Sequence, residues 1–469
     1  MRARRCVAVL LWFCAAASCA WAQQAPSAVL PPAQLGASTE FLKAADEVLA
    51  EMSKLLSLPV LEPLKRSVRT KEEIRTYLVR NMHEEQDGAK LHADVRTLEM
   101  LGLLPKGYPL EQKLIDLLTE QIAGVYDPKG KEFFIAATTE PAELRVVMAH
   151  ELTHALQDQS FRIEPWTKAA KGNDDAQFAR DSVLEGSATV AMIDYLMRDS
   201  GTSFRDLANF DPTLLMGDVD GGQGMKDVPL VLRDQLLFPY LSGAAFSVKV
   251  LSAAGGWTGL HSIFEKPPTS TQQIMHPDLY LRGVQPETVE LPQMNGIVPR
   301  GWKKLDENVI GEFGLNQVFK QFLGKARADE LAATWSGDRY AVYEQSPEGR
   351  ALLVIRVRLA GEAEAARFFA GYSELLGKRY AKPASDVKAA NSLFFDTANG
   401  GAFIRCSGRD CLLGEGATRA QVDAMARAMG WPVARAAAVS PARPFRRPGS
   451  LALAGGQPGQ PLSQGLSAR

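Results

Sequence analysis

The first part of the chain is patterned for helices followed by a β-hairpin. Between residues 39 and 124, apolar residues recur at spacings of three and four, the period of an amphipathic helix. The clearest stretches are TEFLKAADEVLAEMSKLLSL, TKEEIRTYLVRNMHEEQ and YPLEQKLIDLLTEQIAG. The next segment, residues 124–136, places two short β-prone runs on either side of the turn-prone sequence DPKG, which predicts a hairpin.

Longer helical patterns occupy the middle of the chain. Residues 174–200 predict one long helix, and a polar loop at residues 160–174 precedes it. A further helix is predicted after Pro229, with a kink at Pro239, because proline removes a backbone donor and crowds the preceding turn. Residues 266–284 are punctuated by prolines and predict a loop.

The C-terminal part predicts a smaller α+β domain, residues 299–432. DRYAVYEQ and ALLVIRVRLA predict a hairpin, EAEAARFFAGYSELLGKRY an amphipathic helix, and TRAQVDAMARAMG a capped final helix. Cys406 and Cys411 flank the turn-prone SGRD, so a disulfide would close this hairpin in an oxidising compartment. Residues 433–469 are rich in Pro, Gly, Ser and Ala and predict disorder. The fold class is therefore α+β, with a mainly helical domain at residues 40–298 before the smaller one.

The N-terminus has the pattern of a secretory signal peptide. Three arginines precede a short apolar run that ends in the A-x-A sequence AWA. Cleavage after Ala22 would remove residues 1–22 and leave a proline-rich flexible linker at residues 23–39. We therefore expect export to the periplasm or the exterior. A lipoprotein anchor at Cys19 is the weaker alternative, because alanine stands where such signals usually carry leucine.

Charge and hydropathy exclude some partners. The chain has 53 basic and 54 acidic residues, for a net charge of −1. A nucleic-acid binder normally shows a strong basic excess, so nucleic acid is not expected as a partner. Beyond the signal peptide, no segment stands out as long and apolar enough to cross a bilayer, so no stable membrane span is expected after cleavage.

The sequence AHELTHALQDQ carries the clearest chemistry. In a helix, residues four apart share a face, so His150 and His154 lie together with Glu151 beside them. Apolar residues, including Met148 and Leu152, occupy the opposite side. Two imidazoles at this spacing can bind one Zn²⁺, and an adjacent glutamate can take a proton from a zinc-activated water. For the start of this helix we expect Thr138 or Thr139 as N-cap and Pro141 in the first turn.

A third ligand is sought after the second histidine. The metzincin pattern would need glycine and histidine where this chain has Gln157 and Ser160. The next predicted helix offers Glu185 in SVLEGSATV. The residues after it are small and permit close packing against the first helix: Gly186, Ser187 and Ala188. This arrangement resembles the gluzincins, thermolysin-like zincins whose third ligand is a glutamate on a following helix. The alternative is that Glu185 is an ordinary helix glutamate.

The resemblance extends beyond the motif. AGVYDPKGKEFFI, AHELTHALQDQ, LEGSAT and PPTSTQQIMHPDLYL together look like a family of bacterial exported HExxH proteins of gluzincin type, over roughly residues 60–290. The resemblance implies a zincin-like catalytic domain and peptidase activity on a peptide or protein substrate. It carries over the zinc ligands His150, His154 and Glu185 and the general base Glu151.

One position departs from the gluzincin pattern. Gluzincins often carry an aspartate four residues after the ligand glutamate, where it holds a ligand histidine; this chain has Thr189 there. Asp181 and Asp158 are candidates for that supporting role. Ordinary surface charge is the alternative for both.

The mechanism also needs a donor for the oxyanion. His276, in the loop after the ligand helix, is the candidate, and the alternative is a structural loop histidine. Tyr240 and Tyr126 are less favoured, because both are also typical packing residues. By analogy with zincins, the hairpin at residues 124–136 would supply the edge strand along which an extended substrate lies.

The sequence thus predicts an exported zinc metallopeptidase. A non-enzymatic zincin-fold envelope scaffold or chaperone is the alternative. The presence of Glu151 favours the enzyme, because a structural zinc site has no need of a general base and usually closes its fourth position with Cys or His.

Overall fold

The structure is a computed structural model that describes residues 39–85, 88–139, 141, 143–201, 203, 227–345, 349–380, 386–389 and 391–433. The predicted signal peptide lies outside these residues, as do the predicted linker and tail apart from Thr39 and Val433. The described residues up to Trp431 form one unit.

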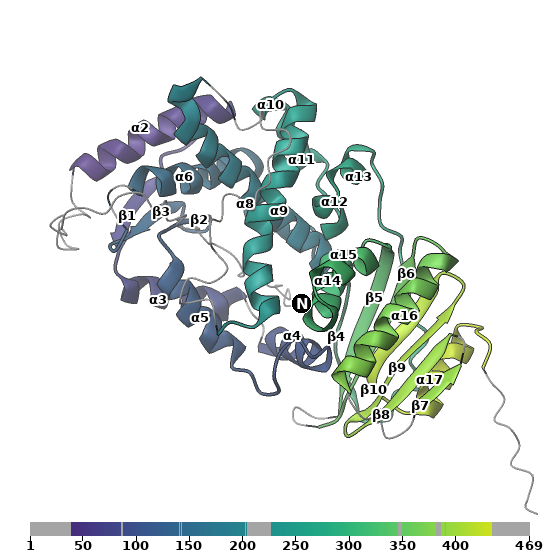
Figure 1. The fold of residues 1–469 in the computed structure, drawn as a ribbon. Helices are drawn as coiled ribbons and strands as arrows, with labels where there is room; N and C mark the ends of the chain where they lie inside the picture. The colour runs from purple at the N-terminus through teal and green to yellow at the C-terminus, as the bar shows by residue number, and fades with distance from the viewer. Residues whose placement is uncertain are drawn as a thin grey trace, which may run out of the picture. The chain divides into compact units, whose positions relative to one another are not determined.

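The N-terminal region consists of helices around a three-stranded sheet (Figure 1). The predicted hairpin is confirmed, because β2 and β3 pair antiparallel with Val125 opposite Phe134. The sequence did not reveal β1, which pairs parallel to β3 and gives the order β1-β3-β2. The elements are α2 (Thr39–Leu56), β1 (Lys65–Arg69), α3 (Lys71–Glu85), α4 (Gly88–Met100), α5 (Leu110–Gln121), β2 (Gly124–Asp127) and β3 (Glu132–Ala136).

The histidine motif lies on α6, whose start differs from the prediction. Helix α6 begins at Leu144 with Glu143 in the N-cap position, and no side-chain cap comes from the described residues. The expectation that Thr138 or Thr139 caps it was wrong: the Thr139 hydroxyl instead donates to the Ala123 carbonyl at 2.8 Å. That bond ties the segment before the helix to the hairpin, which a local capping rule does not foresee.

Three long helices, α6, α8 and α9, lie side by side in this region (Figure 1). The predicted helix at residues 174–200 is confirmed as α8, and proline lies inside α9 at position 239 as expected. The two predicted loops contain short helices. The bounds are α6 (Leu144–Phe161), α7 (Ile163–Lys168), α8 (Asp174–Met197), the 3-10 turn η1 (Arg198–Ser200), α9 (Leu230–Ala254), α10 (Trp257–Leu260), α11 (Ser262–Glu265), α12 (Thr271–Met275) and α13 (Pro277–Leu281).

Helix α9 bears on the expectation that no segment after the signal peptide is long and apolar enough to cross a bilayer. Among the described residues it is the one helix whose length and composition would suffice to cross a membrane. However, 61% of its most apolar window is buried inside the protein, and it packs along α8. Burial of this kind is what the core helix of a folded domain shows, and hydropathy alone does not distinguish the two cases.

The C-terminal region is an antiparallel sheet with helices, which confirms the α+β class. Seven strands run in the order β4-β5-β6-β10-β9-β8-β7. The predicted hairpin, amphipathic helix and capped last helix are β5–β6, α16 and α17. The bounds are β4 (Lys303–Asn308), α14 (Gly311–Leu323), α15 (Lys325–Ala332), β5 (Trp335–Glu344), β6 (Ala351–Leu359), α16 (Glu362–Arg379), β7 (Asp386–Ala389), β8 (Ser392–Thr397), β9 (Gly400–Ser407), β10 (Asp410–Ala417) and α17 (Arg419–Ala428).

The two faces of this sheet pack against different elements, because side chains alternate along a strand. Tyr340 and Val342 face a core that includes α14, α15 and α16, which cover that side (Figure 1). Ala341 and Tyr343 face the core that includes α17. Cys406 and Cys411 are opposite each other on β9 and β10, with sulfur atoms 2.03 Å apart, the disulfide distance that the predicted bridge requires.

Both predicted domains contribute to one apolar cluster. Leu114 of α5 and Val231 of α9 belong to the same cluster as Phe319 of α14, Val342 of β5 and Leu375 of α16. The sheet region therefore packs on the helical region through a shared core. The boundary between residues 298 and 299 stays a prediction.

Candidate metal centre

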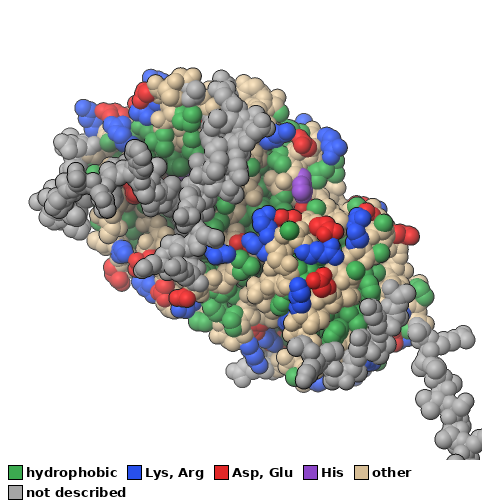
Figure 2. All heavy atoms as spheres, viewed as in Figure 1, with side chains coloured by type: hydrophobic (Ala, Val, Ile, Leu, Met, Phe, Trp, Pro, Cys, Tyr) green, Lys and Arg blue, Asp and Glu red, His purple; other side chains and the backbone are tan. Residues whose placement is uncertain are grey.

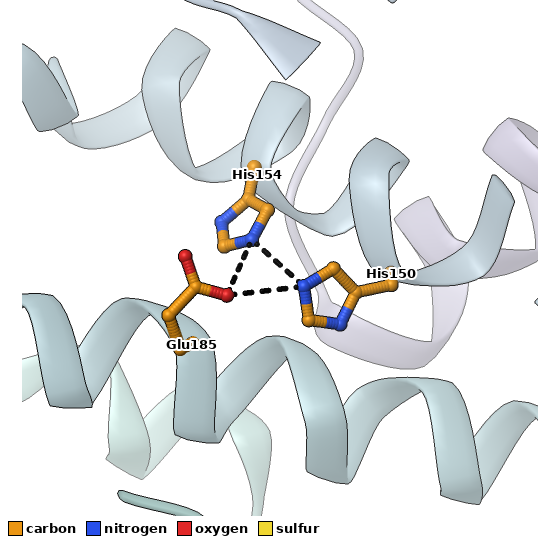
Figure 3. A group of neighbouring side chains, drawn as sticks. All are labelled: His150, His154 and Glu185. Carbon is orange, nitrogen blue, oxygen red and sulfur yellow. Dashed lines mark hydrogen bonds and ion pairs between the residues drawn. The ribbon is translucent and has the colours of Figure 1, made fainter. Parts of the chain in front are cut away.

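Three side chains from two helices converge at one point (Figure 3). The Nε2 atoms of His150 and His154 are 3.2 Å apart. Glu185 Oε2 lies 3.2 Å from the first of these nitrogens and 3.5 Å from the second. The three residues predicted as ligands are thus brought together, and their donor atoms form a group that could hold a metal ion.

Helix α6 presents the histidines from inside the protein. Every residue from Val147 to Asp158 is buried, and His154 has no exposed surface. One side of α6 packs on the apolar cluster of α2 and the small sheet, through residues such as Met148 and Leu152. The opposite side faces α8. The apolar stripe predicted opposite the histidines is confirmed, but the histidine side is covered as well.

The carboxylate and the imidazoles affect each other's protonation. Burial opposes charge on both groups, which lowers the pKa of His154 and raises that of Glu185. Their mutual attraction outweighs burial, so the pKa of His154 is raised overall and the pKa of Glu185 is lowered. The two shifts therefore favour the ionised pair, an anionic Glu185 beside a protonated His154, over the neutral pair.

Glu151 lies beside the histidines as predicted, and strand β2 orients it. One carboxylate oxygen of Glu151 accepts the Tyr126 backbone N–H at 2.8 Å. Strand β2 is an edge strand of the small sheet, as the zincin analogy requires. The outward-facing Tyr126 N–H already binds Glu151, so a substrate strand would have to use other groups of this edge. The close approach of β2 to α6 depends on Gly124, because a Cβ at this position would come within 2.6 Å of the Val147 side chain.

Gln157, not an aspartate, lies on the His154 side of α6 and is the candidate to support that histidine. The Gln157 amide donates to Ser187 Oγ on α8 at 2.8 Å. Hydrogen bonding by Gln157 is among the causes that raise the pKa of His154, after burial, which lowers it, and the carboxylates of Glu185 and Glu151. In the sequence, Gln157 stood out only as the residue in the place of the metzincin glycine. Its position three residues after His154, on the same side of the helix, is the signal that could have identified it.

The residues proposed for that role lie elsewhere. Asp158 accepts hydrogen bonds from the Tyr126 hydroxyl, the Lys131 ammonium and the Ile163 backbone N–H, which is a structural role. Asp181 lines a cavity one turn before Glu185 on α8. The Thr189 hydroxyl is buried and has no hydrogen-bond partner among the described residues. The interpretation of Asp158 as a support for a ligand histidine is therefore wrong.

The candidate oxyanion donors are placed differently from each other. His276 lies between α12 and α13 and pairs with Glu312 on α14 at 2.7 Å, and this hydrogen bond raises its pKa. The structure gives His276 no hydrogen bond with the three converging side chains. The Tyr240 ring on α9, in contrast, lies against the His150 ring with centroids 6.1 Å apart. Among the three candidates, Tyr240 contacts one of the converging side chains, His150. The Tyr126 hydroxyl instead donates a hydrogen bond to Asp158.

The prediction that the small residues after Glu185 pack against α6 needs correction at Gly186, where α8 crosses α9. Gly186, next to Glu185, packs against α9 and not against α6. A Cβ there would lie 2.6 Å from the Ala244 backbone nitrogen and nearer still to the Gly243 carbonyl group. The glycine pair lets the backbones of α8 and α9 touch. Neighbouring residues of α8 contact α6: Glu185 meets the two histidines, and Ser187 accepts a hydrogen bond from Gln157.

Comparison with known proteins reaches only the C-terminal region. Residues 300–426 match a family model described as a domain of unknown function (DUF8575), about a quarter of the chain. That match runs from β4 into α17 and excludes the converging histidines and glutamate. No curated protein and no solved structure matches the chain.

Proposed function

We propose that this protein is an exported zinc metallopeptidase of gluzincin type. The observation that carries the proposal is the geometry of the three donor atoms. In a tetrahedral zinc site with bonds of about 2.0–2.1 Å, neighbouring ligand atoms lie about 3.3 Å apart. The separations between the two Nε2 atoms and Glu185 Oε2 are 3.2, 3.2 and 3.5 Å.

The chemistry of the donors supports the same reading. Two imidazole nitrogens and one carboxylate, with an open fourth position, form a typical donor set of a catalytic zinc site. All three side chains are buried. Their nitrogen and oxygen lone pairs meet at one buried point, where either protons or a metal ion must compensate them. Glu151 adds a carboxylate next to the site that a purely structural centre would not need.

In the proposed hydrolysis of a peptide bond, each residue at the site has a distinct role. When zinc is bound, it lowers the pKa of its water and polarises the scissile carbonyl. Glu151, oriented by the Tyr126 N–H, accepts the proton of the attacking water and delivers it to the leaving nitrogen. Gln157 lies one turn after His154 on the same side of α6 and donates to Ser187 of α8, and from there it would steady the His154 ring. Tyr240 is the donor nearest the site that would stabilise the oxyanion, with His276 the alternative.

The fold around the site supports a zincin-like catalytic region. Helix α6 carries both histidines, the following long helix α8 carries the glutamate, and the edge of a small sheet borders the general base. Export rests on the N-terminal sequence pattern. On the face drawn in Figure 2, basic and acidic side chains are interspersed, which gives no reason to expect a strongly charged partner.

Metal analysis combined with a cleavage assay tests the proposal. Wild type, Glu151→Gln and Glu185→Ala are purified without added chelator and compared by elemental analysis and by mass spectrometry of a digested peptide library. The exposed Glu120→Gln on α5 is the matched control. We expect zinc in wild type, Glu151→Gln and the control, loss of zinc in Glu185→Ala, and cleavage only by wild type and the control.

Two outcomes would overturn this assignment. Wild-type protein that takes up no zinc would exclude the metal centre. Zinc in wild type without cleavage of any peptide would favour the non-enzymatic envelope scaffold or chaperone instead.

A further inference from the structure

A cavity of about 240 Å³ lies where the helical region meets the C-terminal region. Its walls come from α4, α5, α8, α9 and α14 and are mostly apolar, with Leu98, Leu114, Phe178, Leu232 and Phe313 among them. A protein cavity of about 150 Å³ is enough to bind benzene. This cavity can therefore hold one aromatic ring with a short substituent.

The polar part of the wall has more negative than positive groups. Asp94, Asp174, Asp175 and Asp181 line the cavity, and Lys90 is the one basic residue among the described residues that line it. The Lys90 ammonium is already shared, since it contacts Asp94 and lies 2.8 Å from Asp174 and 3.2 Å from Asp306. These three carboxylates could form a metal cluster, but Lys90 supplies a cation among them.

Two further groups in the wall are suited to a hydrogen-bond donor. The Gln317 carbonyl oxygen is buried without a hydrogen-bond partner among the described residues, and Gln317 is 4% exposed. Burial raises the pKa of Asp175 to about 7, although the Thr271 N–H and hydroxyl donate to this carboxylate. Burying such acceptors is costly unless a donor or a cation compensates them.

We infer that the cavity binds an apolar primary amine, with its ring among the leucines and phenylalanines and its ammonium group near the aspartates. The apolar walls supply affinity for the ring, and the excess of carboxylates over Lys90 selects a cation over a neutral or anionic head group. The site requires no zinc, so it goes beyond the proposed peptidase activity.

The ligand would lie close to the candidate metal centre. Asp174, Phe178, Asp181 and Glu185 fall on one face of α8, and the last two are separated by one helical turn. Such an amine is either a small molecule or the N-terminal residue of a peptide, because both offer an ammonium group beside an apolar side chain.

The test uses probes that differ only in the head group. Binding of 3-phenylpropylamine, 3-phenylpropan-1-ol and 3-phenylpropionate to the full chain is measured by calorimetry. We expect the amine to bind at least about tenfold more tightly than the alcohol, and the acid to bind least. A second arm compares Phe-Ala-Ala amide with its N-acetylated form. Tighter binding of the free amino form than of phenylpropylamine indicates a peptide N-terminus; the reverse indicates a small amine.

Variants locate the binding site. Leu232→Trp fills the cavity and should abolish amine binding, while the matched Leu42→Trp, at an exposed position on α2, should not change it. Asp181→Asn keeps the shape of the wall and should reduce the preference for amine over alcohol by about tenfold, which serves as the test if the tryptophan variant does not fold. Equal affinity for all three head groups would overturn the inference. So would unchanged binding in folded Leu232→Trp, or no binding of the amine at about 10 mM.

Discussion

We expect the candidate metal centre to depend on the crossing of α8 and α9, and replacing Gly186 with alanine tests this directly. An added Cβ would lie 2.6 Å from the Ala244 backbone nitrogen, whereas non-bonded heavy atoms normally stay about 3.5 Å apart. The obstacle is backbone, so no side chain can rotate away. Because the Gly243 carbonyl group would be nearer still to the added Cβ, the two helices must separate locally by more than about 1 Å.

The expected cost follows from that displacement. Overpacking a tight core costs about 1–3 kcal/mol, and alanine regains up to about 1 kcal/mol of helix propensity. We therefore expect Gly186→Ala to lower the free energy of unfolding by about 1–2 kcal/mol. The effect on zinc should be larger, because ligand distances in a zinc site vary by only about 0.2 Å and Glu185 is the next residue. We expect zinc affinity to fall by at least about tenfold.

Urea unfolding of the metal-free protein and competition with a chromophoric zinc chelator measure the two effects. Gly377→Ala is the matched control, because Gly377 is exposed on α16 and a Cβ there meets nothing within 4 Å. The control should gain about 0.5–1 kcal/mol and bind zinc as wild type does. If Gly186→Ala unfolds at the same urea concentration as wild type and keeps its zinc affinity, the close helix crossing is refuted.

Three further predictions concern protons and supporting residues. Because Glu185 raises the pKa of His154, protons compete with zinc near neutral pH, so zinc affinity measured by chelator competition should still rise with pH above about 6.5. A pH-independent affinity between about 6 and 8 would contradict this. Gln157→Leu should weaken zinc binding by about tenfold in the same assay, whereas Gln112→Leu on the exposed face of α5 should not. The folded-state pKa of Asp175 is raised to about 7 from an ordinary value of 3.8, so its stabilising contribution is present below pH 3.8 and lost as pH rises to about 7. The free energy of unfolding of wild type, from urea titrations at each pH, should therefore fall over this range by roughly 4 kcal/mol more than that of Asp175→Asn, and parallel curves would exclude the shift.

Local rules predicted what local interactions determine. The spacing of His150 and His154 placed both on one face of α6, because helix geometry alone decides it. Thr418 and Gln421 form the predicted capping box of α17, which involves residues three apart. The hairpin of β2 and β3 was likewise predictable, because its turn begins at Asp127 and involves only neighbouring residues.

Contacts between distant segments were not accessible in this way. Nothing near Gly186 in the sequence indicates that it meets Gly243, 57 positions later on another helix. Thr139 satisfies the criteria for a cap but bonds the Ala123 carbonyl instead, because the hairpin is closer than the helix end. The partner of His276 is Glu312, and the sequence alone cannot distinguish this partly buried pair from an oxyanion donor.

Helix α8 gives the C-terminal region a direct influence on the metal centre. Its first turn is fixed from two directions: the Asp174 backbone N–H donates to Asn308 Oδ1 at 2.8 Å, and the Asp175 carboxylate accepts from Thr271. Asn308 belongs to β4, within the segment that matches the domain of unknown function. Since a packed helix moves as a rigid body, a shift of β4 at the start of α8 would be transmitted to Glu185 three turns later. The sheet region thus helps to set the position of Glu185, a candidate metal ligand.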